Sequence, residues 1–215
     1  MTQPAINSND SNPATPAEIL DFWLADGWAQ GWPTPDLGKR WFGGGAALDQ
    51  EIKTRFGAQV VQALGGGLQD WENGSAQPSS RLALVILLDQ FTRNVFRGTG
   101  RAFDGDARAQ RLVLDTLAHQ ADRQLPWVAR VFTYMPLMHA EDQALQDEGV
   151  ACFERLQADA PAALKPRLQG NLDAARQHRD IIARFGRFPY RNAVLGRVNT
   201  PEEENFLHQG PRFGQ

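Results

Sequence analysis

Residues 46–67, AALDQEIKTRFGAQVVQALGGG, contain the pattern that decides the fold class. Apolar side chains recur there at every fourth position, a spacing that places them on one face of an α-helix. These side chains are Leu48, Ile52, Phe56, Val60 and Leu64. Glycines follow at positions 65–67, and glycine is the usual residue just beyond a helix end. The stretch therefore predicts an amphipathic helix with one buried face.

The same spacing recurs in later parts of the chain. Apolar stripes with three- and four-residue steps lie within residues 109–117, 145–156 and 164–185. The apolar run of residues 82–88 is short of β-branched side chains and predicts a buried helix. No stretch alternates apolar and polar residues between hairpin turns. The sequence thus predicts an all-α domain of about eight helices, with short loops and antiparallel helix pairs.

The first helix is marked by Thr15, a typical N-cap residue, and by Pro16 in the first turn. We expect residues 1–14 to form a flexible tail, because they are polar and hold too few apolar side chains to pack. Residues 15–215 are expected to form a single all-α domain. Residues 27–45 are rich in Gly, Pro and Trp, which predicts an interrupted segment rather than a long helix. Its tryptophans are expected to pin it to the domain body: Trp28, Trp32 and Trp41.

The composition limits the class of function. The chain has 22 basic and 25 acidic residues, so we expect no general nucleic-acid or anionic-membrane surface. Cys152 is the only cysteine, which excludes an internal disulfide and a cysteine-rich zinc site. No segment approaches the ~18 apolar residues that span a bilayer. We therefore expect a cytoplasmic protein that recognises anions only locally.

Polar residues that interrupt an apolar stripe are the first candidates for a functional site, because an unpaired buried polar group costs about 1–3 kcal/mol. Residues 82–98, LALVILLDQFTRNVFRG, contain one such interruption. Helical steps of three and four place Asp89 and Arg93 on the same face as Leu82 and Val85. The acid and the arginine therefore point inward, where they can pair with each other.

A second interruption lies in the segment MPLMHAEDQAL, where His139 and Asp142 are three residues apart and are expected to face the core side. The alternative is that Glu141 and Asp142 complement the positive end of a helix that begins near Pro136.

The third interruption is His178, which shares a helical face with Ala175 and Ile182. This placement fits a hydrogen-bonded core histidine. It also fits a member of a functional site, because three separate helices would each contribute an inward polar group.

Arginines gather in residues 178–197, HRDIIARFGRFPYRNAVLGR, although the net charge of the chain is −3. One interpretation is that they bond the last carbonyls of the preceding helix and the loop, as basic residues near helix ends often do. The other is that Arg191 and Arg93, helped by neighbouring asparagines, hold a small anion such as phosphate or carboxylate. The candidate ligand-binding residues are Asp89, Arg93, Asn94, Arg187, Arg191 and Asn192, and the candidate catalytic residues are His139, Asp142 and His178.

Common catalytic signatures are missing from the sequence. It contains no G-x-S-x-G, no G-x-x-x-x-G-K-[ST], no H-E-x-x-H and no G-x-G-x-x-G. A metal site built from His139, Asp142, His178 and Asp180 is disfavoured, because the last two diverge on a helix. We therefore predict no cofactor and no metal.

Several segments together resemble the bacterial domain-of-unknown-function family 924. They are LLDQFTRNVFRGTGRAFDGD (87–106), YMPLMHAEDQ (134–143), HRDIIARFGRFPYRN (178–192) and LGRVNTPEEENFL (195–207), joined by ILDFW (19–23) and WFGGGAALDQEIKTRFG (41–57). The resemblance covers nearly the whole chain beyond the tail. It implies a tetratricopeptide-like stack of antiparallel helix pairs and supplies no established reaction.

The family pattern includes all of the candidate residues above. The sequence departs from it at Thr92, where the family usually has proline, and at Tyr190, where the family usually has histidine. The second departure argues against proton transfer at that position, because the unperturbed pKa of tyrosine is about 10.

Three functions remain open at this stage. The leading hypothesis is a binding protein for a small anion or an acidic peptide end, with Arg93 and Arg191 as charge partners and His178 and Asp142 as orienting groups. The second is an enzyme of hydrolytic or transfer type that uses His178 or His139 as a base. The third is an interaction scaffold in which the polar groups only fix helix packing. A closed pocket with convergent polar groups would favour the first two over the third.

Overall fold

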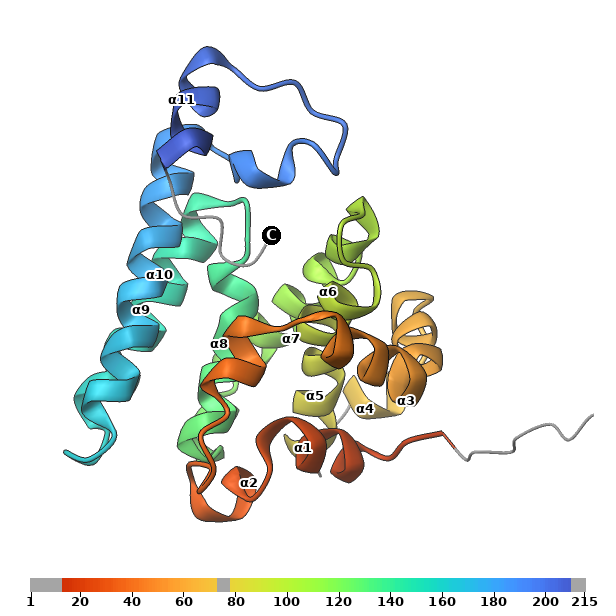
Figure 1. Ribbon diagram of the computed structural model, residues 1–215. Coiled ribbons are helices and arrows are strands. Elements are labelled where there is room, and N and C mark those ends of the chain that lie inside the picture. The colour runs from red at the N-terminus through yellow and green to blue at the C-terminus, as the bar shows by residue number, and fades with distance from the viewer. Residues whose placement is uncertain (1–12, 73–77, 210–215) are drawn as a thin grey trace, which may run out of the picture.

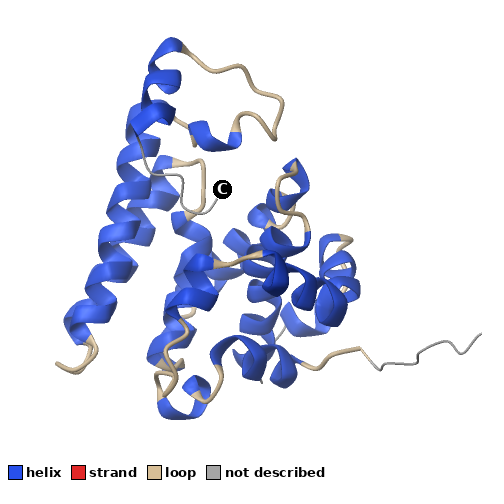
Figure 2. Cartoon of the chain, viewed as in Figure 1, coloured by secondary structure: helices blue, strands red, loops and turns tan. Residues whose placement is uncertain are grey.

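The computed structural model describes residues 13–72 and 78–209 (Figure 1). Within these ranges every regular element is helical (Figure 2), which confirms the all-α prediction. There are eleven α-helices in the described chain, and eight of them have seven or more residues. The pairing of helices as in tetratricopeptide repeats stays a prediction.

The helices are α1 (Pro16–Leu24), α2 (Gly27–Gln30), α3 (Ala46–Leu64), α4 (Gln69–Glu72), α5 (Pro78–Val85), α6 (Thr92–Val95), α7 (Asp106–Ala118), α8 (Trp127–Met138), α9 (Gln143–Asp159), α10 (Lys165–Phe185) and α11 (Pro201–Gln209). Two π-helical turns (Lys39–Gly43 and Ile86–Phe91) and three short 3₁₀ turns (Gly100–Phe103, Ala121–Gln124 and Pro189–Arg191) connect them.

The two helix ends that the sequence marked most clearly are found where they were predicted. At the start of α1, the Thr15 hydroxyl accepts from the Glu18 amide (3.3 Å), and the Glu18 carboxylate accepts from the Thr15 amide (2.7 Å). This reciprocal pair satisfies amides that the first turn leaves without helical partners. Helix α3 ends at Leu64, directly before the three glycines.

An aromatic cluster forms the centre of the core and joins α1, α3 and the π turn Ile86–Phe91. The Phe91 ring lies 5.3 Å from Trp23 and 5.0 Å from Phe56 between ring centroids. All three side chains are buried. Because aromatic rings bury a large apolar area each, this cluster fixes the π turn against the N-terminal helices.

The interrupted segment of residues 27–45 contains α2 and the π turn Lys39–Gly43. Its three tryptophans pack against the core, as predicted, and the indole of Trp41 donates to the Trp23 carbonyl (2.8 Å). Of the predicted tail, residues 1–12 lie outside the described residues. None of the described helices combines the length and the apolar character that crossing a bilayer requires.

Helices α8, α9 and α10 pack in sequence order along one side of the molecule (Figure 1). The prediction that a helix begins near Pro136 is wrong, because α8 begins after Pro126 and continues through Pro136 to Met138. A proline inside a helix removes one backbone hydrogen bond. Here the side chains around it are buried, and their packing holds the last turn together.

The segment after α10 covers the C-terminal end of α8. Helix α10 ends at Phe185, and the cap residue Gly186 has a φ of +69°, the left-handed conformation that glycine favours. The chain then returns, and Glu141 accepts from the Phe188 amide (2.8 Å) and from both terminal nitrogens of Arg197 (2.6 and 2.9 Å). This carboxylate ties the returning loop to the connection between α8 and α9.

Gly105 brings the start of α7 against the π turn. A Cβ atom at this position would overlap the Leu88 carbonyl oxygen and lie 2.9 Å from the Leu88 carbonyl carbon. Real Cβ atoms do not approach backbone this closely, so only glycine allows α7 to start here.

We expect Gly105→Ala to lower the free energy of unfolding by about 3 kcal/mol, because either α7 or the π turn must move. The matched control is Gly57→Ala, inside α3, where the added methyl meets only the Lys53 Cγ at 3.8 Å. That change should be neutral or stabilising by up to about 1 kcal/mol. Urea unfolding measures both variants, and equal effects would contradict the close approach.

Candidate functional site

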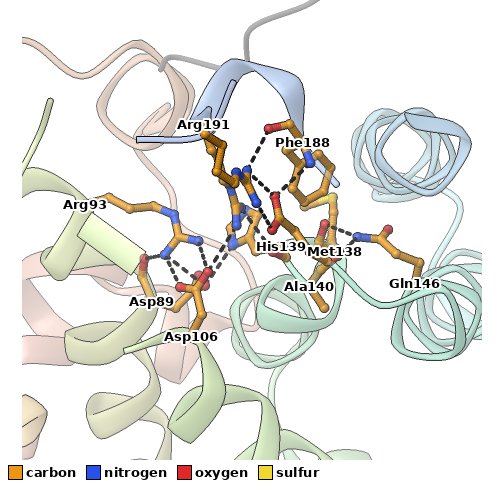
Figure 3. A network of polar contacts seen from close by, with 11 residues as sticks. Asp89, Arg93, Asp106, Met138, His139, Ala140, Gln146, Phe188 and Arg191 are labelled. Carbon is orange, nitrogen blue, oxygen red and sulfur yellow. Dashed lines mark hydrogen bonds and ion pairs between the residues drawn. The ribbon is translucent and has the colours of Figure 1, made fainter. Parts of the chain in front are cut away.

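The site begins with Asp89, which lies in the π turn Ile86–Phe91 and is completely buried. Its Oδ1 accepts from His139 Nδ1 (2.7 Å), and its Oδ2 accepts from Gln90 Nε2 (2.5 Å). The guanidinium of Arg93 lies 3.3 Å from Oδ1 (Figure 3). Burial alone would raise the pKa of this carboxyl, but the interactions with His139 and Arg93 outweigh it and hold the pKa below its usual range.

The π turn was not predicted from the sequence. Helical spacing predicted that Asp89 and Arg93 point inward together, and both do, but through a widened turn rather than a regular helix. Both the amide and the hydroxyl of Thr92 bond the Leu87 carbonyl and close this turn. A proline at this position would lack that amide donor.

A second carboxylate, that of Asp106, completes the pairing of Arg93. The distances from Arg93 Nη1 to Oδ1 and from Nη2 to Oδ2 are 3.0 and 3.2 Å (Figure 3). Burial lowers the pKa of Arg93, but Asp106 and Asp89 more than reverse this, so the pKa is raised. Sequence reasoning missed Asp106, because an acid at the start of a helix is common for reasons of the helix dipole alone.

Arg191 is the second arginine of the site, and its charge is less well compensated than that of Arg93. Its Nη1 lies 3.4 Å from Asp106 Oδ2, and its Nη2 donates to the His139 carbonyl (3.0 Å). Its Nε has no hydrogen-bond partner within the described residues. The Phe103 and Phe188 rings lie 4.4 and 4.5 Å from the guanidinium carbon, as in cation–π contacts. Burial first, and then repulsion from Arg93, lowers the pKa of Arg191.

The two predicted histidines lie together, with ring centroids 6.1 Å apart. His178 Nδ1 donates to the Ala174 carbonyl (2.8 Å), since a carbonyl only accepts. Burial, with help from His139, lowers the pKa of His178 to about 3, so its ring is neutral at pH 7. In both rings Nδ1 is the donor, and in the neutral ring of His178 this leaves Nε2 as an acceptor.

Most of these groups line one cavity of 660 Å³, whereas Asp89 and Asp106 do not. Its polar lining includes Gln90, Arg93, Asn94, His139, His178 and Arg191. Its apolar lining includes Trp23, Trp32, Trp41, Val131, Met135 and Met138. The volume lies within the range of pockets for small ligands, about 300–1,000 Å³. Sequence reasoning placed the tryptophans in a structural role only and missed their part in this cavity.

Tyr190 also lines the cavity, and its ring stacks on Phe188 with centroids 5.2 Å apart. Burial raises the pKa of its hydroxyl further above its ordinary value. The phenol therefore stays protonated near neutral pH, in line with the expectation that it is not a proton carrier.

The structure brings five of the nine candidate residues to the cavity wall, namely Arg93, Asn94, His139, His178 and Arg191. Asp89 lies behind the wall and holds His139 and Arg93 from the rear. Asp142 is exposed, and its carboxylate caps α9 by accepting from the Leu145 amide (2.9 Å). The prediction that Asp142 faces the core is therefore wrong, since Asp142 precedes the first turn of α9 and does not share a helix with His139.

Arg187 and Asn192 have structural contacts away from the cavity lining. Arg187 forms a two-point ion pair with Glu203 (2.6 and 2.8 Å), and the Asn192 amide donates to Asn199 (2.8 Å). Most of the clustered arginines thus pair with acidic side chains rather than with helix carbonyls, as the contact of Arg184 with Glu202 (2.8 Å) also shows. No three metal-binding side chains come together in the described part of the chain.

Comparison with known proteins shows to which family the chain belongs. Residues 19–211 match the profile described as bacterial protein of unknown function, DUF924. The chain belongs to this family. It is also similar to the solved structure of the protein of unknown function ATU0120 from Agrobacterium tumefaciens, with 35% identity and a TM-score of 0.74 over 91% of this chain and 97% of that one. No curated protein matches the chain significantly.

The low pKa of His178 predicts how the free energy of unfolding depends on pH. Because the folded pKa of about 3 lies below the ordinary value of 6.5, only the unfolded chain gains a proton at this residue between these values. The free energy of unfolding should therefore fall as pH drops below 6.5, by up to about 1.4 kcal/mol per pH unit from this group.

Urea unfolding between pH 7.5 and 5.0 measures this slope. His178→Gln should reduce it, whereas His119→Gln, at a side chain that is 73% exposed, should leave it unchanged. An unchanged slope in His178→Gln would show that the ring is not buried in its neutral form.

Proposed function

We propose that the protein binds a small anion in the cavity, with Arg191 as the principal charge partner. The observation that carries the proposal is that Arg191 is buried and incompletely paired. Arg191 is 5% exposed, and its guanidinium shares Asp106 with Arg93 and keeps Nε without a partner in the described chain. An anion beside it would supply the missing counter-charge and accept from the free edge of the guanidinium.

We assign Arg93 and Arg191 different roles, whereas the sequence hypothesis made both of them charge partners of the ligand. Arg93 is saturated by Asp89 and Asp106, which makes it a positioning group rather than a free charge partner. The Phe103 and Phe188 rings pack against its guanidinium, and we expect a ligand to contact the edge that carries the unpartnered Nε. His178 and His139 stand beside the same space and offer polar contacts to the ligand.

The cavity favours a small molecule over an acidic peptide end. Its lining comes from the N-terminal segment, the π turn Ile86–Phe91, α6, α8, α10 and the loop after α10, which together border a space of drug-like size. A scaffold function receives less support, because polar groups from several elements converge on the cavity rather than on an open apolar face.

Catalysis is the second candidate, and the Asp89–His139 hydrogen bond favours it. A carboxylate that holds Nδ1 leaves Nε2 of the imidazole free to take a proton, as in a general base and its orienting acid. The cavity lining contains no serine, threonine or cysteine among the described residues, so a nucleophile of these three types has no source there. Activation of water or of the ligand itself is the reaction type that the His139 base would serve.

A thermal-shift panel of phosphate, nucleotides and short and aromatic carboxylates tests the binding proposal. A ligand at ten times its Kd adds about 1.4 kcal/mol, which raises the Tm of a chain of this size by about 3–5 °C. The rise should vanish in Arg191→Met. It should persist in the matched control Arg187→Met, which loses an ion pair in the same loop but lies outside the cavity lining.

A panel without any stabilising anion would end the proposal, and a rise that survives Arg191→Met would move the site elsewhere. Incubation of each stabilising ligand with the protein, followed by proton NMR, separates the two candidates. Conversion that is lost in His139→Gln supports catalysis, and binding without conversion of any ligand argues against it.

A further inference from the structure

The cavity has two chemically different ends, and their separation defines a class of ligand. Helix α8 runs along the wall and contributes Val131, Met135 and Met138, then His139 just beyond its end. Arg191 bonds the carbonyl of His139, so the charged end lies at the C-terminal end of this helix.

The aromatic end lies further back along α8. The Trp41 ring is 5.0 Å from Phe132, and the Trp23 ring is 5.9 Å from the same side chain. Trp32 packs at right angles to Trp41 with centroids 6.3 Å apart. At 1.5 Å of rise per residue, Phe132 and His139 are separated by about 10 Å along the helix axis.

The size of the cavity also argues against a bare inorganic ion. A phosphate group takes about the space of four waters, or ~120 Å³, whereas the cavity measures 660 Å³. An ion at Arg191 would leave the tryptophan and methionine surfaces unfilled. Met135 and Met138 are unbranched and adapt readily to a ring placed against them.

We infer that the ligand is an organic anion with an apolar, ring-bearing body, whose charged group lies at Arg191 and whose ring lies between the tryptophans and the methionines of α8. This inference rests on the proposed function, and it adds the substrate class to it. A span of about 10 Å between the two ends corresponds to a ring joined to its carboxylate or phosphate by a short linker.

Three matched compounds test the inference by isothermal titration: 3-phenylpropionate, propionate and 3-phenylpropan-1-ol. The first has both the ring and the charge, and each of the others lacks one of them. We expect 3-phenylpropionate to bind at least about tenfold more tightly than either, since burying a ring is worth a factor of this order. Its binding should also change tryptophan fluorescence, because three tryptophans line the cavity.

Trp32→Leu assigns the aromatic end, and Arg191→Met assigns the charged end. Trp32→Leu should weaken 3-phenylpropionate at least about fivefold and leave propionate unchanged, since apolar contact area is lost only for the ring. Trp32 is a clean target, because its indole N–H has no partner within the described residues. The control is Trp127→Leu, a partly buried tryptophan outside the cavity lining.

The outcomes separate this inference from the proposed function. Equal affinity for propionate and 3-phenylpropionate, with no effect of Trp32→Leu, overturns the inference and leaves anion binding standing. Equal affinity for the acid and the alcohol, with no effect of Arg191→Met, overturns anion binding. No binding of any of the three compounds overturns the inference for ring-bearing carboxylates.

Discussion

The buried carboxylate of Asp89 is the constraint on which the rest of the site depends. It is completely excluded from solvent, and a buried charge that loses one partner costs about 3–5 kcal/mol. The fold therefore has to place polar partners next to this carboxylate. These partners are His139, at the end of α8, and Arg93, in α6. Arg93 needs a further charge partner in turn, and Asp106 at the start of α7 is that partner.

This chain of pairing explains why distant parts of the sequence meet at one place. Gly105 lets α7 approach the π turn, and the approach sets Asp106 against Arg93. Arg191 is the last member of the series, and it receives only a long contact with Asp106 and a carbonyl. The aromatic faces of Phe103 and Phe188 hold it in place without neutralising it. A buried positive charge that the protein pairs only through a long contact is the feature from which we infer ligand binding.

Much of the fold could be predicted from local patterns, because those patterns act over one helical turn. The stripe that ends at Leu64 and the cap at Thr15 are examples. The π turn around Asp89 could not be predicted, since a continuous apolar run carries no period in which an extra residue would show. Asp142 was misplaced for a similar reason, because a three-residue step was read across the break between two helices.

The sequence predicted which residues line the candidate site better than it predicted what each of them does. Inward spacing identified Arg93, His139 and His178, and the arginine cluster identified Arg191, all of which line the cavity. The sequence contains no signal that Arg93 would be saturated while Arg191 would not. That difference depends on Asp106, which is distant from Arg191 in sequence and meets it only through the tertiary fold.

The central claim is that Arg93 serves the structure and Arg191 serves a ligand. The free energy of unfolding of Arg93→Met and Arg191→Met, measured by urea without added anions, tests it most directly. The account predicts a loss of about 3–5 kcal/mol for Arg93→Met, which leaves two buried carboxylates short of a partner. Arg191→Met should change the free energy by about 1 kcal/mol or less, or even stabilise the protein, because repulsion between the arginines is removed. Equal and large losses in both variants would contradict the account and make Arg191 a structural residue like Arg93.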